Sequence, residues 1–195
     1  MNDLIILRGK SGSGKTKVSN LLKEHLNLPR VTPYTTRQKR ENEYDGNPYH
    51  FISESEMSQL LKKAEKENII LSETTYGDGK YLALTSDLPQ LSQITVNDNG
   101  IERILTQHRE TINPVLIRLT GCHINDPTRT NRDKGMLYLP NSIFHYTINN
   151  KDTSIEELEE QTLELFIQRI LPKLEEQRYK RITNNLAYQK LCINE

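Results

Sequence analysis

The fold of this chain is decided by one stretch near its start, Gly9-Lys10-Ser11-Gly12-Ser13-Gly14-Lys15-Thr16. The stretch matches the pattern G-x-x-x-x-G-K-[ST] of a phosphate-binding loop. Its glycines permit turns that aim successive backbone N–H groups inward, and the start of the following helix favours a bound anion. We expect Lys15 to reach the β- and γ-phosphates of a nucleotide and the Thr16 hydroxyl to ligate Mg²⁺. The predicted nucleotide-binding residues are Gly9, Ser11, Gly12, Ser13, Gly14, Lys15 and Thr16.

The residues on both sides of the loop predict the opening of an α/β fold. The unbroken apolar run Leu4–Leu7 is typical of a strand that is buried on both faces of a parallel sheet. Apolar residues then recur at helical spacing, which predicts a helix from about Gly14 to Leu26. Strand, glycine-rich loop and helix form the start of a βαβ unit, so we predict a P-loop NTPase-type parallel sheet flanked by helices.

Further elements follow along the chain. Apolar spacing predicts a helix over 54–66, and a glycine-bearing turn predicts short antiparallel strands at 69–71 and 81–84. We expect central strands at 94–96 and 115–119 and another strand at 144–148. A capping box at Ser154 predicts a helix whose inward residues are Ile155, Leu158, Leu163 and Phe166, and which Pro172 interrupts or kinks.

Composition limits the function. The 195 residues carry 26 Lys and Arg and 26 Asp and Glu, so the net charge is zero and gives no reason to expect a nucleic acid or an anionic membrane as partner. The first apolar run is too short for a signal peptide or a membrane span. Two cysteines, Cys122 and Cys192, form no disulfide framework. We therefore predict a cytoplasmic protein, and nothing in the sequence indicates its oligomeric state.

A second motif contains arginines that suit a phosphate. It reads Thr35-Thr36-Arg37-Gln38-Lys39-Arg40, then Glu43-Tyr44-Asp45-Gly46, then Tyr49-His50-Phe51. Arg37 and Arg40 can converge on one phosphate, since guanidinium groups make paired contacts with it. Taken alone, a basic run of this kind is more often a solvated surface.

Together with the loop before it, this motif closely resembles the guanylate kinase family, whose pattern reads roughly T-T-R-x-x-R, acidic-x-x-G and Y-x-F. The resemblance extends loosely to Thr74–Tyr81 and to Tyr146–Asn150. It implies that the loop binds ATP and Mg²⁺, and that Asn150 contacts adenine. It further implies that Arg37, Arg40, Tyr49 and Tyr81 bind the phosphate of a small phosphorylated acceptor, with GMP or dGMP favoured.

The resemblance also implies a lid that closes over the phosphates. The candidate is the segment Asp126–Arg132, in which Arg129 and Arg132 join Lys15 as catalytic residues. An ordinary polar surface loop is the alternative interpretation, and the stretch between the two flanking candidate strands is shorter than is typical of the family. The implied organisation is a single domain over 1–195, with an acceptor-binding subdomain at about 33–90, a lid at about 121–135 and a charged extension at about 173–195.

The positions expected to recognise the base depart from the family pattern. Guanine offers N1–H and N2–H₂ donors, which suit carboxylates, yet Ser72 and Asn97 align where the family has acidic residues. Likewise, Leu82 aligns with a glycine, and Pro33 and Ala83 align with hydroxyl-bearing residues. In one interpretation the register slips by one, so that Glu73 and Asp98 contact guanine. In the other, the pocket accepts another base or a compound that is not a base.

The predicted function is ATP-dependent phosphoryl transfer to a nucleoside monophosphate. Other functions stay open at this point, among them a regulatory or motor NTPase, for which no water-activating residue is identified in the sequence. Two alternatives on the guanylate kinase-like fold also remain. One is a kinase of a phosphorylated sugar or other metabolite on the same fold. The other is a guanylate kinase-like binding module without turnover, which the complete phosphate loop disfavours.

Overall fold

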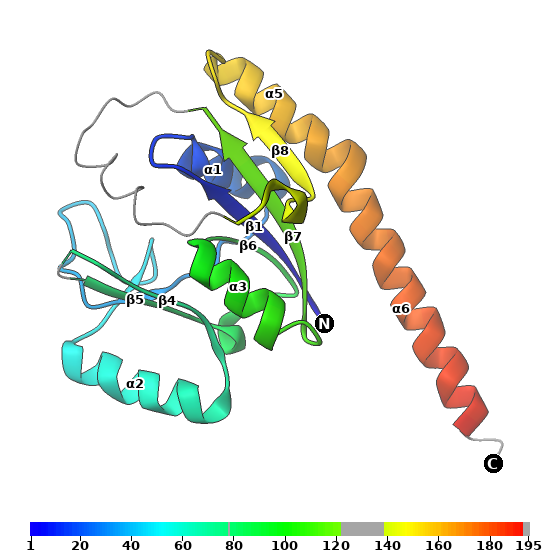
Figure 1. Cartoon of the computed structure of the whole chain (residues 1–195), viewed down its shortest axis with the longest axis horizontal. Helices are drawn as coiled ribbons and strands as arrows, with labels where there is room; N and C mark the ends of the chain where they lie inside the picture. The colour runs from blue at the N-terminus through cyan, green and yellow to red at the C-terminus, as the bar shows by residue number, and fades with distance from the viewer. Residues whose placement is uncertain (78, 122–138, 193–195) are drawn as a thin grey trace. The chain divides into compact units, whose positions relative to one another are not determined.

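A four-stranded parallel sheet forms the centre of the first compact unit, Met1–Asp152 (Figure 1). The computed structural model describes residues 1–77, 79–121 and 139–192. The sheet has the order β6-β1-β7-β8. Its strands are β1 (Asn2–Gly9), β6 (Leu91–Thr95), β7 (Ile112–Thr120) and β8 (Tyr146–Asn149). Leu4–Leu7 are each 0% exposed, so the predicted doubly buried strand is confirmed and lies inside the sheet.

The expectation of two central strands is half correct. β7 lies between β1 and β8, whereas β6 forms an edge of the described sheet. The preceding loop occupies that edge, because the Gln93 N–H donates to the Pro29 carbonyl and the Val31 N–H donates to the Gln93 carbonyl, both at 2.9 Å. The backbone groups of this edge strand are thereby paired without a further strand, and Ser92, Gln93 and Ile94 are buried.

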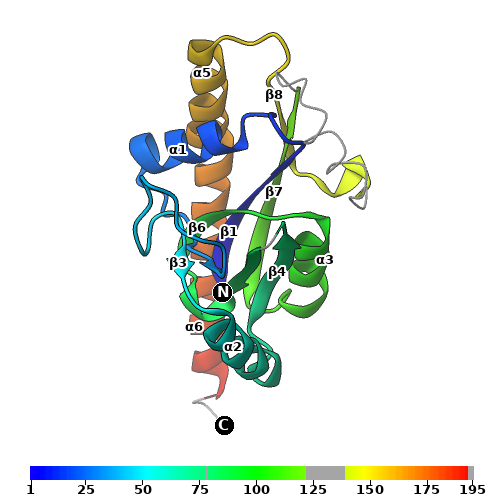
Figure 2. The same cartoon turned by 90° about the vertical axis from the view of Figure 1, so that its left-hand side faces the viewer.

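Two helices lie against this sheet, α1 (Lys15–Leu26) and α3 (Asp98–Gln107). Figure 2 shows them on opposite sides of β1 and β7. Leu4 and Ile6 pack in one core cluster with Ile101 and Ile104 of α3. Since side chains alternate along a strand, Ile5 and Leu7 point to the other face, where α1 contacts β1 and β6.

A second, smaller sheet has the order β3-β2-β5-β4. Its strands are β2 (Tyr34–Thr35), β3 (His50–Phe51), β4 (Ile70–Tyr76) and β5 (Gly79–Leu84), and the predicted antiparallel pairing of the last two is confirmed. Helix α2 (Glu54–Glu67) covers one face, where Met57 and Ala64 pack on Ile70 and Leu82. The other face contributes Leu71 and Ala83 to the same core as β1 and α3. Short 3₁₀ turns occur at η1 (Thr85–Asp87) and η2 (Asn141–Ile143).

The second compact unit comprises Thr153–Glu195 and is helical. It contains α5 (Ile155–Leu165), the π-helical turn η3 (Phe166–Ile170) and α6 (Leu171–Cys192). The predicted capping box of Ser154 and Glu157 is confirmed. Ile155 was wrongly predicted to face inward, because it is 60% exposed, and Pro172 does not end the helix. The wider η3 turn ends at Ile170, two residues before this proline, which cannot donate the usual helical hydrogen bond.

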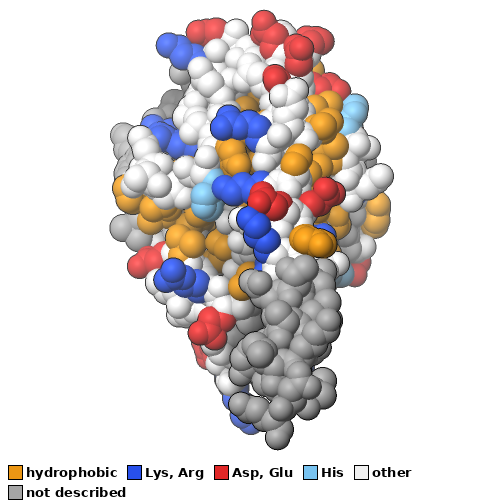
Figure 3. Space-filling model, turned by 90° about the vertical axis from the view of Figure 1, so that its right-hand side faces the viewer, with side chains coloured by type: hydrophobic (Ala, Val, Ile, Leu, Met, Phe, Trp, Pro, Cys, Tyr) orange, Lys and Arg blue, Asp and Glu red, His pale blue; other side chains and the backbone are white. Residues whose placement is uncertain are grey.

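Charges are interspersed on the surface. On the face shown in Figure 3, Lys and Arg side chains lie among Asp and Glu side chains. Across the described part of the chain, no helix combines the length and the apolar character that crossing a membrane requires.

Candidate functional site

The phosphate loop joins the carboxyl end of β1 to α1. Gly12 and Gly14 have positive φ angles of 80° and 90°, which side-chain-bearing residues rarely adopt. Gly9 has a different constraint: a Cβ atom there would lie 2.3 Å from Ser13 Oγ and 2.7 Å from the Leu119 carbonyl oxygen. Glycine is therefore required at Gly9 by the close approach of the loop and β7.

Lys15 and Thr16 begin α1 at the mouth of this loop. Lys15 Nζ donates to the carbonyl oxygens of Gly9 at 2.8 Å and Lys10 at 2.7 Å. These contacts hold the ammonium group over the loop, where it can exchange carbonyl partners for phosphate oxygens. Thr16 is exposed, so its hydroxyl is accessible to a ligand.

Asn150 forms a hydrogen bond with the backbone of the phosphate loop. This residue follows β8, is 5% exposed, and donates from Nδ2 to the Ser13 carbonyl at 3.2 Å. A contact of Asn150 with adenine stays a prediction, and the described contact is with the loop backbone.

One large cavity of about 760 Å³ connects the loop to the arginine motif. It lies at the carboxyl end of β1. There the connections after β1 and β6 lead to α1 and α3, which lie on opposite sides of the sheet, and ligands commonly bind at such a point in α/β folds. The loop side contributes Gly9, Ser11, Lys15 and Thr16, and the second sheet with its preceding segment contributes Arg37, Arg40, Tyr49 and Tyr81. The structure thus brings the two predicted motifs to one cavity.

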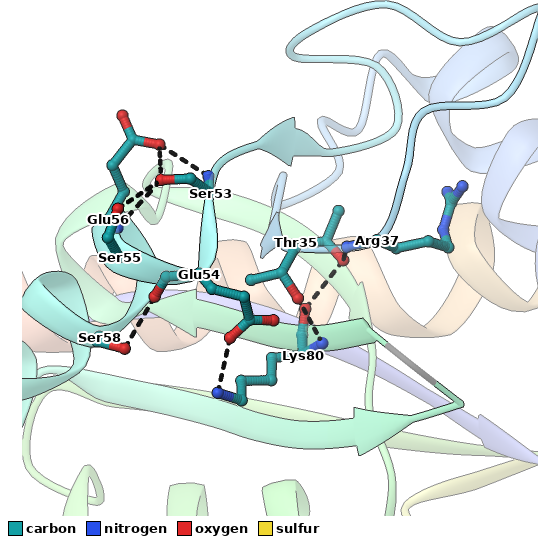
Figure 4. A network of polar contacts seen from close by, with 9 residues as sticks. Thr35, Arg37, Ser53, Glu54, Ser55, Glu56, Ser58 and Lys80 are labelled. Carbon is teal, nitrogen blue, oxygen red and sulfur yellow. Dashed lines mark hydrogen bonds and ion pairs between the residues drawn. The ribbon is translucent and has the colours of Figure 1, made fainter.

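The segment Thr35–Arg37 is fixed to the β4–β5 hairpin through Lys80. Figure 4 shows that Thr35 Oγ1 lies between two backbone groups: it donates to the Lys80 carbonyl at 2.9 Å and accepts from the Arg37 N–H at 3.2 Å. The Lys80 N–H donates to Thr36 Oγ1 at 3.1 Å, and Lys80 Nζ pairs with Glu54 of α2 at 2.8 Å. These bonds determine where the Arg37 side chain begins.

The Arg37 guanidinium is oriented by a carboxylate and aromatic rings. Its Nη2 atom lies 2.9 Å from both carboxylate oxygens of Glu43, and its Cζ atom lies 5.4 Å from the Tyr49 ring centroid and 5.6 Å from that of Phe51. A hydrogen bond from the Arg40 N–H and the pairing with Arg37 hold the pKa of Glu43 below its usual value. Glu43 therefore stays ionised and keeps Arg37 in place before an anion arrives.

Tyr49 and Tyr81 complete this end of the cavity. Their rings lie edge to face with centroids 5.4 Å apart. Burial raises the pKa of Tyr49, so its hydroxyl stays protonated and can donate a hydrogen bond to an anion.

Farther along β4, the cavity is lined by Ser72 and Thr74, and Glu73 does not line it. Ser72 lies opposite Ala83 and Thr74 opposite Tyr81, whereas Glu73 lies opposite Leu82, which packs toward α2. An irregularity between Ile70 and Ser72 sets this alternation. The expectation that Glu73 faces a bound base does not match this geometry.

A similar choice occurs at the start of α3. Asn97 caps the helix, since its side chain accepts from the Gly100 N–H at 2.9 Å, and its Nδ2 donates to Thr74 Oγ1 at 3.3 Å beside the cavity. Asp98 is 3% exposed and pairs with Arg8, whose Nη2 lies 3.2 Å from Asp98 Oδ2. Asn97 thus lines the cavity, and Asp98 is held by Arg8 instead of facing a base.

The predicted lid residues Arg129 and Arg132 lie outside the described residues. Other cavity residues were missed from the sequence. Arg30 lines the cavity and donates to Ser19 Oγ at 2.9 Å and Asn20 Oδ1 at 2.8 Å. A lone arginine in a proline-rich stretch gives no sequence signal of this position.

The residues present fit a nucleotide with Mg²⁺. Mg²⁺ keeps several waters and takes few protein ligands beside phosphate oxygens, and the Thr16 hydroxyl at the start of α1 is placed to be one of them. Within the described ranges, no group of three or more His, Cys, Asp or Glu side chains is arranged to hold a metal ion alone.

Comparison with known proteins gives concordant findings. A family model described as guanylate kinase matches residues 1–111. A guanylate kinase of Bartonella quintana is 47% identical over 53 residues, which are 27% of this chain and 24% of the relative. A guanylate kinase of Helicobacter pylori is 38% identical over 80 residues, which are 40% of this chain and 39% of the relative. The matched segments thus span between about a quarter and two fifths of these curated relatives.

A solved structure has the same fold over a longer stretch. The crystal structure of a guanylate kinase from Anaplasma phagocytophilum superposes with a TM-score of 0.57, at 20% sequence identity, and 87% of each chain is covered. At 20% sequence identity, this similarity shows that the two chains share the α/β fold and shows nothing beyond the fold.

Proposed function

Because the chain belongs to the guanylate kinase family, we propose that it transfers the γ-phosphoryl group of ATP to a nucleoside monophosphate. One observation carries the proposal: the phosphate loop and the Arg37 segment line the same cavity. A donor phosphate bound at Lys15 and an acceptor phosphate bound at Arg37 would face each other there. The curated relatives are guanylate kinases, so GMP and dGMP are the first acceptors to assay.

In this proposal the chain acts by positioning and by charge stabilisation. The loop N–H groups and Lys15 hold the phosphates of ATP, while Arg37, Arg40, Tyr49 and Tyr81 hold the acceptor phosphate. Mg²⁺, with Thr16 as its protein ligand, would neutralise phosphate charge. The acceptor oxygen then attacks the γ-phosphorus in line, and ADP leaves. Arg129 and Arg132 remain candidates for stabilising the charge on the transferred group.

The test is ADP formation from ATP and Mg²⁺ with a panel of nucleoside monophosphates. Lys15→Ala should lower kcat/KM by about 100-fold or more, because it removes a cation from the transferring phosphates. Lys23→Ala makes the same change at an exposed position of α1 and serves as the matched control. Failure to form ADP with every monophosphate would refute the proposal and favour a phosphorylated sugar or other metabolite, or a module that only binds.

A further inference from the structure

The part of the cavity lined by Ser72, Thr74 and Asn97, here called the base end, contains no described carboxylate. Moving along β5 from Tyr81 to Ala83, the facing residues on β4 are Thr74 and Ser72, and Asn97 lies beside them. Among the described residues that line the cavity, Glu43 is the one carboxylate, and both of its oxygens lie 2.9 Å from Arg37 Nη2. No described carboxylate is therefore available at the base end.

The polar groups at this end can each donate or accept. The Thr74 hydroxyl accepts from Asn97 Nδ2, which leaves its own hydrogen to donate. The Ser72 hydroxyl lines the cavity close to Gly100 of α3, and a hydroxyl can both donate and accept. Pro33, Ala83 and Val96 supply apolar walls around these groups. Such a site can hold a planar base without requiring that the edge of the base carry hydrogen-bond donors at fixed positions.

Guanine differs from hypoxanthine by a single group, the 2-amino group, which only donates hydrogen bonds. A carboxylate that accepts from N1–H and N2–H₂ together would discriminate strongly between them, because the analogue without the amino group leaves a charged acceptor unpaired. Sites built around such a bond reject the analogue by roughly 10⁴-fold. Hydroxyl groups can rotate toward water instead, and the Asn97 amide already contacts the Gly100 N–H and Thr74 Oγ1, so discrimination by these neutral groups is weak.

We propose that Ser72, Thr74 and Asn97 form a neutral base subsite that does not select guanine by its 2-amino group, so that the protein accepts GMP and IMP with similar efficiency. This inference rests on the proposed function, because a comparison of kcat/KM for two acceptors requires that the protein catalyses the proposed phosphoryl transfer. In this proposal the side chains that choose the acceptor base are distinct from the side chains that bind the acceptor phosphate.

The experiment compares kcat/KM for GMP and IMP in the wild-type protein and in two variants. Asn97→Asp places a carboxylate at the base end with almost no change of shape, and aspartate caps a helix as well as asparagine does. Asn99→Asp makes the same chemical change two residues later, at an exposed position in the first turn of α3 that does not line the cavity. The second variant therefore controls for the added charge.

We expect the wild-type efficiencies for GMP and IMP to lie within about 10-fold of each other, and Asn97→Asp to raise the ratio in favour of GMP by about 10-fold. Asn99→Asp should leave the ratio unchanged. A wild-type preference for GMP beyond that range would overturn the inference while leaving the kinase proposal intact. An equal response of the ratio to both variants would overturn the role of Asn97.

Equilibrium binding separates the two proposals. If no ADP forms with any monophosphate, the kinase proposal fails, and the dissociation constants of GMP and IMP measured by calorimetry decide the inference. Constants within about 10-fold of each other support the neutral subsite, and a stronger preference for GMP contradicts it. Should Asn97→Asp not fold, the wild-type comparison still decides.

Discussion

Replacement of Gly9 by alanine tests the geometry of the phosphate loop most directly. The φ angle of Gly9 is not in the left-handed region, so an added methyl group is opposed by contacts alone. That methyl group would lie 2.3 Å from Ser13 Oγ and 2.7 Å from the Leu119 carbonyl oxygen. The serine can rotate, but the carbonyl belongs to β7, whose Leu119 is the register partner of Gly9 in β1.

Crowding of this kind costs about 1–3 kcal/mol. For a chain of this length, that corresponds to a fall in Tm of about 2–12 °C. Moving the loop away from β7 also displaces the N–H groups that would bind phosphate, so we expect ATP affinity to fall by at least about 10-fold. Urea denaturation measures the first effect and titration calorimetry with ATP measures the second.

The Ser13→Ala variant serves as a second parent protein, in which the effect of Gly9→Ala is measured without the contact to Ser13 Oγ. Ser13 Oγ is buried and has no hydrogen-bond partner among the described residues, so its removal should not destabilise the protein. In the Gly9→Ala/Ser13→Ala double variant the shorter contact is gone and the contact with Leu119 remains, which predicts partial recovery of stability. Wild-type stability and ATP affinity in the Gly9→Ala variant would refute the reasoning.

Three further outcomes are expected. Glu43 has a pKa below its usual value of 4.5, so its stabilising contribution is present above that pH and is lost as the pH falls through the lower folded-state value. Urea unfolding between about pH 5 and pH 3 should therefore show a smaller loss of stability for Glu43→Gln than for the wild type, and equal losses would contradict this. Ser53→Ala removes the capping box of α2 and should cost about 1 kcal/mol, measured by thermal unfolding against Ser58→Ala, whose hydroxyl donates to the Glu54 carbonyl and makes no capping contact. Arg37→Lys loses the paired contact and the ring contact, so the KM for the acceptor should rise by about 10-fold, and an unchanged KM would place the acceptor phosphate elsewhere.

The sequence was sufficient where one local pattern determines one structure. The phosphate loop follows from its glycines, and β1 follows from an apolar run that only a doubly covered strand can bury. The Ser154 capping box follows from residue types three apart. Each of these depends on neighbours within a few residues, so each was predictable without a tertiary structure.

Tertiary structure decided what neighbouring residues face. Ile70 lies opposite Leu84 and Ser72 opposite Ala83, so β4 has one residue more than β5 between these pairs. Because of this irregularity, Ser72 faces the cavity and Glu73 faces the α2 side. Simple alternation from Ile70 would have placed them the other way round.

The same holds for the remaining polar residues of the cavity. Asn97 and Asp98 are adjacent in sequence, and only the start of α3 and the position of Arg8 determine that the amide lines the cavity and the carboxylate does not. Arg37 and Glu43 are six residues apart, and their pairing depends on how the intervening segment folds back. The sequence by itself therefore determined the phosphate loop and the α/β fold. Which side chains would contact the acceptor was decided by strand register and long-range packing, because a shift of one residue reverses the direction of every side chain on a strand.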